Sequence, residues 1–182
     1  MQPIVTSLAT LTLLIDLTIL SLPIIYLMKK KTSLLERKTV SKIQTVLKTR
    51  ARELSLLTAL TATTGSLYLS NVLGWTPCRL CWFQRIFMYP LVVLLTVSLL
   101  LDRKDVQDFV IPMTLVGLPI SIYHYLVQRV EQFHSAGCSI LQVSCQTEYT
   151  FHYGYITIPL MAATAFLAIL LLMSYYSFSQ TE

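Results

Sequence analysis

The chain has 182 residues, of which 54% are hydrophobic and 13% are charged, and its mean hydropathy is +0.63. A soluble domain carries about 25% charged residues, so this composition excludes an ordinary soluble protein and favours a protein surrounded by membrane lipid. The net charge of +5 does not indicate a nucleic-acid partner, because the positive charge is concentrated in residues 29–53 and the rest of the chain is slightly acidic.

The first predicted element is an apolar segment, residues 1–28. It contains Asp16 and Pro23, but it has neither a basic stretch before it nor a small-residue cleavage site after it, so it is not typical of a signal peptide. We therefore predict an additional N-terminal transmembrane helix. An acidic residue inside a membrane span is by default a functional hypothesis, and a packing role is the alternative for Asp16.

A basic segment, residues 29–53, follows this helix and holds nine Lys and Arg against two Glu. Basic residues beside a span mark its cytoplasmic end, so we predict that this segment is cytoplasmic. Apolar residues recur within it at helical spacing. The pattern indicates an amphipathic linker, which is either a solvated helix or a helix lying on the membrane surface.

Four further segments are uncharged and close to the roughly 20 residues that a membrane-spanning helix needs. They cover residues 54–73, 86–101, 109–127 and 155–178. The predicted fold is an all-α membrane protein, with a four-helix transmembrane bundle over residues 54–178 plus one additional N-terminal transmembrane helix. With the basic segment inside, loops 74–80 and 128–154 lie outside, and the tail, residues 179–182, is cytoplasmic.

All four cysteines fall on the predicted outer side: Cys78 and Cys81 as a C-x-x-C motif, Cys138 and Cys145 in the long loop. Four cysteines allow three connectivities, and pairing of neighbours is the simplest. Disulfides persist outside the cytoplasm. A zinc site is disfavoured because the second pair lacks the close spacing, so we predict no metal. Structural staples remain an alternative, although a bridge over two residues closes too short a loop to stabilise a fold much.

The stretch "GWTPCRLCWFQRIF", residues 74–87, combines the thiol pair with a cation. Pro77 suits the first turn of a helix. A helix starting there would place Cys78 and Cys81 at the positive end of its dipole, which favours a thiolate. Arg85 follows Cys81 by four residues and shares its helix face, where its charge would favour the thiolate and polarise a bound electron acceptor. Snorkelling of Arg85 to the membrane interface is a compatible alternative.

At these residues the sequence resembles the disulfide bond formation protein B (DsbB) family, and most closely its shorter BdbC-type members. The resemblance covers about residues 54–178 and rests on four stretches: "LGWTPCRLCWFQRIFMYPL" (73–91), "ISIYHYLVQ" (120–128), "AGCSILQVSC" (136–145) and "YGYITIPLMA" (153–162). It implies a thiol:quinone oxidoreductase of a bacterial-type plasma membrane. Such an enzyme reoxidises a DsbA-like thioredoxin-fold partner, passes the electrons to the quinone pool as ubiquinone or menaquinone, and supports disulfide formation in exported proteins.

The resemblance also implies roles for the cysteines. Cys138–Cys145 would be the pair that exchanges with the partner. Cys78–Cys81 would take the electrons from that pair, and Cys81 would face the quinone.

Three further residues are predicted to bind the quinone. Arg85 matches the family's quinone-site arginine, while Gln84 stands where some members have an acidic residue. His124 lies near the outer end of its span, at the depth expected of a quinone pocket, with a role as an interhelical histidine as the alternative. Residues 1–53 have no counterpart in the family pattern.

Two rival functions remain. The vitamin K epoxide reductase-like family also combines a small helical bundle with two thiol pairs, but there the loop pair precedes the C-x-x-C in the chain, whereas here the C-x-x-C comes first. The other rival is a non-enzymatic membrane scaffold or metal-binding protein with stapled outer loops. A mixed disulfide with a soluble partner would distinguish a redox relay from both a scaffold and a metal protein.

Overall fold

The computed structural model describes residues 3–28, 34–130, 145 and 150–180. Its order of elements is α1 (Pro3–Met28), α2 (Leu34–Leu67), a π-helical turn η1 (Tyr68–Val72), α3 (Arg79–Leu100), α4 (Gln107–Arg129) and α5 (Ile158–Gln180). The described residues form no strand beyond an isolated bridge between His152 and Ile156. The predicted all-α class is therefore confirmed for this part of the chain.

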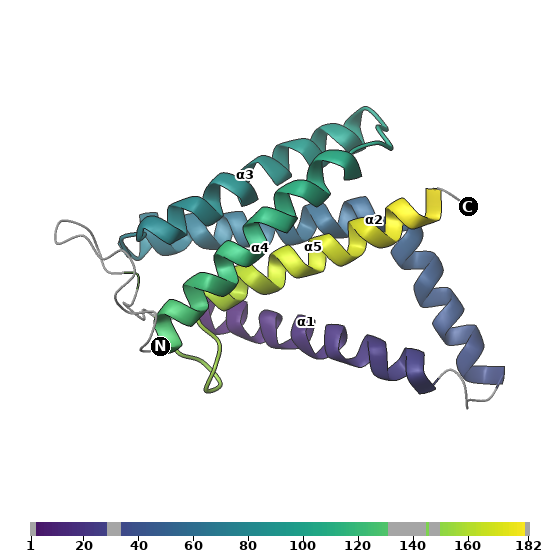
Figure 1. The fold of residues 1–182 in the computed structure, drawn as a ribbon, viewed down its shortest axis with the longest axis horizontal. Helices are drawn as coiled ribbons and strands as arrows, with labels where there is room; N and C mark the ends of the chain where they lie inside the picture. The colour runs from purple at the N-terminus through teal and green to yellow at the C-terminus, as the bar shows by residue number, and fades with distance from the viewer. Residues whose placement is uncertain (1–2, 29–33, 131–144, 146–149, 181–182) are drawn as a thin grey trace.

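Helices α2, α3, α4 and α5 pack side by side, and α1 lies against α5 on the outside of this group (Figure 1). The first turns of α2 extend away from the bundle. The predicted cytoplasmic linker and the first core span are thus one continuous helix for most of their length. Only the end of that span departs from α geometry, in the π-helical turn η1.

Three of these helices, α3, α4 and α5, are long and apolar enough to cross a membrane. Helix α1 is apolar over Pro3–Ile19 as well, and α2 carries many Thr and Ser in its second half. A multi-pass membrane protein is supported, whereas the crossing of the membrane by α1 and α2 stays a prediction. The boundaries of the predicted regions likewise stay predictions.

The core of the bundle is apolar and lies where α3, α4 and α5 face one another and α2. Its fully buried side chains include Leu91, Leu95, Val110, Phe166 and Ile169. Helices in lipid approach closely where small residues meet large ones. Gly117 of α4 is such a position, because a Cβ atom there would lie 2.5 Å from the ring of Phe166 on α5.

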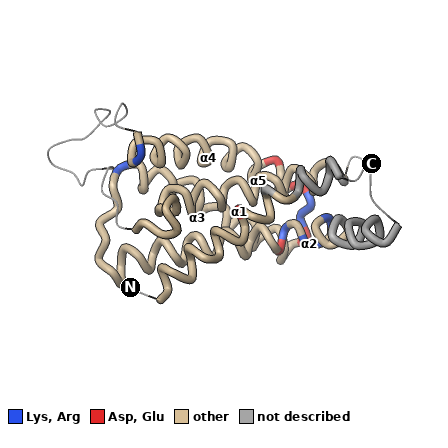
Figure 2. Tube along the Cα trace, turned by 90° about the horizontal axis from the view of Figure 1, so that it is seen from below, with Lys and Arg blue, Asp and Glu red and all other residues tan. Residues whose placement is uncertain are grey.

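Charged residues lie mainly towards the two ends of the bundle, with long uncharged stretches between them (Figure 2). At one end Arg52 of α2 closes the turn between α3 and α4. Its guanidinium donates to Oδ1 of Asp102 at 2.9 Å and to the carbonyl oxygen of Arg103 at 3.0 Å. Asp102 adopts a positive φ of 46°, a conformation that Asp tolerates better than most residues. The contacts fix the end of α3 opposite to the thiol pair.

Candidate functional site

The C-x-x-C motif lies at the start of α3, as the sequence predicts, but the helix begins later than expected. Residues before it turn at Gly74, which has a φ of 69°. Cys78 is the N-cap residue in an extended conformation, and its carbonyl oxygen accepts the first helical hydrogen bond, from Trp82 at 3.2 Å. Pro77 thus lies before the helix, and Cys78 precedes its first turn. Cys81 lies within that first turn.

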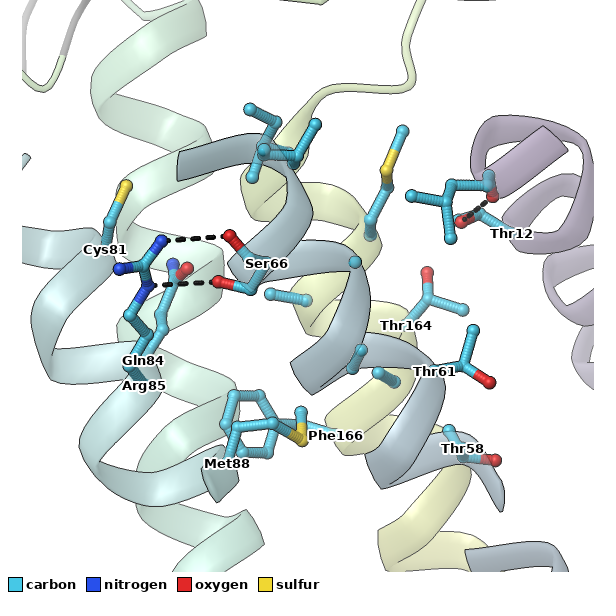
Figure 3. Close-up of a pocket in the computed structure, with 18 of the residues that line it drawn as sticks. Thr12, Thr58, Thr61, Ser66, Cys81, Gln84, Arg85, Met88, Thr164 and Phe166 are labelled. Carbon is cyan, nitrogen blue, oxygen red and sulfur yellow. Dashed lines mark hydrogen bonds between the residues drawn. The ribbon is translucent and has the colours of Figure 1, made fainter. Parts of the chain in front are cut away.

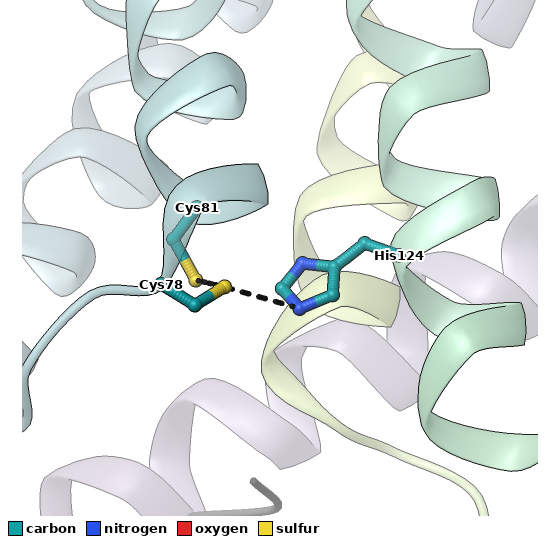
Figure 4. A group of neighbouring side chains, drawn as sticks. All are labelled: Cys78, Cys81 and His124. Atoms are coloured by element: carbon teal, nitrogen blue, oxygen red, sulfur yellow. Dashed lines mark hydrogen bonds between the residues drawn. The ribbon is translucent and has the colours of Figure 1, made fainter. Parts of the chain in front are cut away.

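The two thiols meet at this helix start. Their sulfur atoms are 3.2 Å apart (Figure 4). Cys78 is buried, with 6% of its surface exposed, whereas Cys81 is half-buried. The pair is thus placed to share one disulfide, with one sulfur enclosed by the bundle and the other more accessible.

His124 reaches the thiol pair from α4. Its Nε2 lies 3.5 Å from Sγ of Cys78, and the ring is 1% exposed. The amide N–H of Gln84 donates to Nδ1 of His124 at 3.1 Å. A neutral ring that accepts at Nδ1 carries its proton on Nε2, so that proton faces the sulfur of Cys78. No local pattern indicates this contact, because it joins residues 46 positions apart.

Arg85 is held by a residue that the sequence analysis did not select. Its Nε donates to Oγ of Ser66 at 3.0 Å, and a terminal nitrogen donates to the carbonyl oxygen of Ser66 at 3.1 Å. The hydroxyl of Tyr89 lies 3.3 Å from the same Oγ, and the guanidinium lies 5.3 Å from the centre of the Trp82 ring. Ser66 lies in the last turn of α2, just before η1. A lone serine in a membrane helix is too common to mark a site.

An apolar cavity of about 320 Å³ lies next to Arg85, between α1, α2, α3 and α5. Cys81 and Arg85 face it from one side, and Thr12 of α1 lies on the other side (Figure 3). Gln84 also lines it, but His124 does not. His124 lies instead at Cys78. Of the three residues predicted to bind quinone, Arg85 and Gln84 therefore line the cavity, whereas His124 contacts the buried thiol.

Only one member of the second thiol pair lies within the described residues. Cys145 is half-buried and lies within electrostatic range of Cys81. Cys138 lies outside the described residues. The structure therefore brings one predicted exchange cysteine near the C-x-x-C motif.

The thiol pair and His124 also form a donor set of the kind that binds zinc. Sγ of Cys78, Sγ of Cys81 and a ring nitrogen of His124 all lie within 4.8 Å of one another. Two thiolates and an imidazole are common zinc ligands, and a disulfide between the two cysteines would remove both sulfur ligands. That the protein binds no metal at these residues stays a prediction.

An all-helical membrane protein with two thiols in contact at a helix start, beside an apolar cavity, has the features of a membrane thiol–disulfide oxidoreductase. The comparison with known families agrees. The model of the family described as disulfide bond formation protein DsbB matches residues 48–176, so the chain belongs to the DsbB family. Residues 1–47, including all of α1, lie outside the match.

Curated relatives carry related names. Disulfide bond formation protein C of Bacillus subtilis is 42% identical over 119 residues, which are 65% of this chain and 86% of the relative. The probable disulfide formation protein C of Bacillus cereus is 40% identical over 124 residues, 66% of this chain and 89% of the relative. A probable disulfide formation protein of Coxiella burnetii is 35% identical over 138 residues, covering 74% and 94%. No solved structure matches the chain. Together with the family match, these names support a role in disulfide bond formation.

Proposed function

We propose that the protein is a membrane thiol:quinone oxidoreductase that reoxidises a DsbA-like thioredoxin-fold partner. The observation that carries this proposal is the position of Cys81, whose sulfur lies 3.2 Å from that of Cys78 and which lines the apolar cavity together with Arg85. A thiol pair whose more accessible member borders an apolar cavity is suited to pass electrons to a lipid-soluble acceptor.

The cavity fits a quinone in size and in chemistry. Its volume of about 320 Å³ lies at the lower end of the roughly 300–1,000 Å³ of small-molecule pockets, and its walls are mainly apolar with a few polar groups, as in such pockets. Arg85 offers a cation and N–H donors to a quinone oxygen, and its two bonds to Ser66 fix its orientation. A bound quinone takes up two electrons and two protons. Ubiquinone and menaquinone both fit this description.

The chain's own residues move the electrons by thiol–disulfide exchange, in which a thiolate attacks a disulfide sulfur through a mixed disulfide. The partner's thiolate attacks Cys138–Cys145, and closure of the partner's disulfide releases both loop thiols. A freed loop thiol then attacks Cys78, so that the sulfur of Cys81 leaves as a thiolate beside Arg85. The second loop thiol then attacks this mixed disulfide, which closes the loop pair again and releases Cys78 as a thiol. Closure of Cys78–Cys81 requires an acceptor for two electrons and two protons, which a quinone held at Arg85 would supply.

His124 and the helix start serve this exchange. The Nε2–H of His124 faces Sγ of Cys78, where it can hold a proton at the sulfur or stabilise a thiolate. Free N–H groups at the start of α3 and the positive end of its dipole favour negative charge at this place. Gln84 acts as a positioning residue, because its amide fixes the ring of His124.

The test is quinone reduction by the purified protein with a reduced DsbA-type protein as donor. Cys81→Ser should abolish the reaction. Arg85→Ala should raise the KM for quinone about ten- to a hundredfold, since a hydrogen bond to a charged group contributes about 1.5–3 kcal/mol. Arg79→Ala is the matched control, because Arg79 lies on the same helix but is exposed and does not line the cavity.

Two outcomes would contradict the proposal. Quinone-dependent oxidation of the partner by the Cys81→Ser variant would exclude the relay. Failure of Cys145→Ser to trap a mixed disulfide with the partner would favour a scaffold, and tightly bound metal with four reduced thiols would favour a metal-binding protein.

A further inference from the structure

Helix α1 forms part of the cavity although it lies outside the region that the family shares. Leu8, Leu11, Thr12 and Ile15 line the cavity from α1. The spacing of these four residues, three, four and seven positions from the first, places them on one face of the helix. The face beside it is exposed, with Leu14 at 59% and Leu17 at 55% of their surface accessible. One face of α1 is therefore a wall of the candidate quinone site.

Two contacts hold this wall against the bundle. The hydroxyl of Thr164 on α5 donates to Oδ1 of Asp16 at 2.7 Å, and Thr164 itself lines the cavity. Leu8 packs on α2 at Gly65, where an added Cβ atom would lie 3.2 Å from the leucine side chain. An acidic residue in an apolar helix is costly unless it has a partner. Asp16 thus joins α1 to α5 next to the cavity.

The cavity extends well beyond the reactive groups. It reaches along α2 from Ser66, beside Arg85, to Leu57. Nine residues of α-helix span roughly 14 Å, which is longer than a quinone ring. The part distant from Arg85 is bordered by Ile15 of α1 and by Leu57 and Thr58 of α2. With the ring at Arg85, the remaining length is left for an apolar substituent.

We propose that α1 binds the isoprenoid chain of the quinone, with Leu11 and Ile15 contacting the chain and Asp16 fixing the helix against Thr164. This assignment rests on the proposed quinone reduction. The added helix increases affinity for quinones that carry a chain and contributes nothing to the ring's contacts at Arg85. It makes α1 a specificity element rather than part of the redox machinery.

The experiment compares quinones that share a ring and differ only in the chain. Menadione and menaquinone-4 form one pair, and ubiquinone-0 and ubiquinone-4 form the other, with dithiothreitol as electron donor. Leu11 is 41% exposed and Ile15 is half-buried, so both offer apolar surface that a bound chain would cover. Leu11→Ala and Ile15→Ala should each raise the KM for the chain-bearing quinones about tenfold, because part of this apolar contact is lost. The KM for the chain-free quinones should not change. Leu14→Ala, on the exposed face of the same helix, should behave as the unsubstituted protein.

Binding gives a readout that is independent of turnover. Trp75 lines the cavity, so quenching of tryptophan fluorescence reports the Kd of each quinone for the full-length protein in detergent. Asp16→Leu should weaken only the chain-bearing quinones. Asp16→Asn keeps an oxygen that accepts from Thr164, so its Kd for the chain-bearing quinones should equal that of the unsubstituted protein.

The outcomes separate the two proposals. If the unsubstituted protein reduces no quinone of either pair, the proposed function fails. If it reduces both but the α1 variants change the two KM values equally, or change neither, then α1 serves only the fold and this inference is overturned. Unchanged use of menadione by a variant also shows that the variant is folded.

Discussion

His124 is placed to act on sulfur rather than on the quinone. Its Nε2 lies 3.5 Å from Sγ of Cys78, and it does not line the cavity. We expect His124→Gln to slow oxidation of the partner about a hundredfold, as for removal of a proton-transfer group, while the KM for quinone stays the same. Single-turnover exchange with the partner and steady-state quinone kinetics measure the two effects.

Gln84 offers the control for this prediction. Gln84→Leu removes the N–H that fixes the ring of His124, so it should give a smaller loss of the same kind and a shifted pH profile of exchange. The opposite result, a higher KM for quinone with unchanged exchange in the His124 variant, would contradict this prediction. It would instead support the quinone-binding role expected from the position of His124 near the outer end of its span.

At the scale of elements, the approach of α4 to α5 depends on Gly117. A Cβ atom there would lie 2.5 Å from the ring of Phe166, which is fully buried. Gly117→Ala should therefore destabilise the bundle by about 1–3 kcal/mol, as overpacking does in other cores. Thermal unfolding in detergent measures this loss. In the double variant with Phe166→Leu the added methyl has room, so the effect of Gly117→Ala should shrink; equal effects in both backgrounds would show that the contact is not limiting.

The turn between α3 and α4 should respond to acid. The hydrogen bond from Arg52 and then its charge hold the pKa of Asp102 below its ordinary value. A lowered pKa in the folded state means that the contribution to stability is complete above about pH 4, the ordinary Asp value, and is lost as the pH falls through the folded pKa. Asp102→Asn, which tolerates the positive φ, should therefore lower the melting temperature slightly at pH 7. The difference should disappear in strong acid, and a difference that persists there would contradict the assignment.

At the scale of the whole molecule, the charge distribution predicts the orientation in the membrane. The turn after α3 carries Arg103 and Lys104. Arg52, near the end of the basic segment, donates to Asp102 and Arg103 of the same turn. Because basic loops stay cytoplasmic, we expect the thiol pair on the opposite, outer side.

Labelling of single cysteines tests this orientation. In a variant whose native cysteines are replaced by serine, Lys104→Cys should react with an impermeant maleimide only after the membrane is permeabilised. A variant that retains only Cys145 should react in intact cells. The reverse pattern would place the redox centre in the cytoplasm, where structural disulfides are rare, and would contradict a role in exported proteins.

The elements and the thiol pair were predictable because their signals are local. Apolar length indicates the helices α3, α4 and α5, and spacing along the chain places Cys78, Cys81 and Arg85 at one helix start. The predicted start at Pro77 was wrong: α3 begins two residues later, at Arg79, because Cys78 is extended and forms the N-cap. The helix α2 was predicted in two pieces, since the change from basic to apolar sequence resembles a boundary although the backbone continues through it.

The sequence by itself determined the class of protein, the family and the position of the C-x-x-C motif at a helix start, since hydropathy and spacing act over one or two helical turns. Tertiary structure alone decided which groups those residues meet. His124 approaches Cys78, Ser66 holds Arg85, and α1 closes the cavity through Asp16 and Thr164. Each of these contacts joins different helices, and it depends on how the helices rotate and pack against one another, which no local pattern specifies.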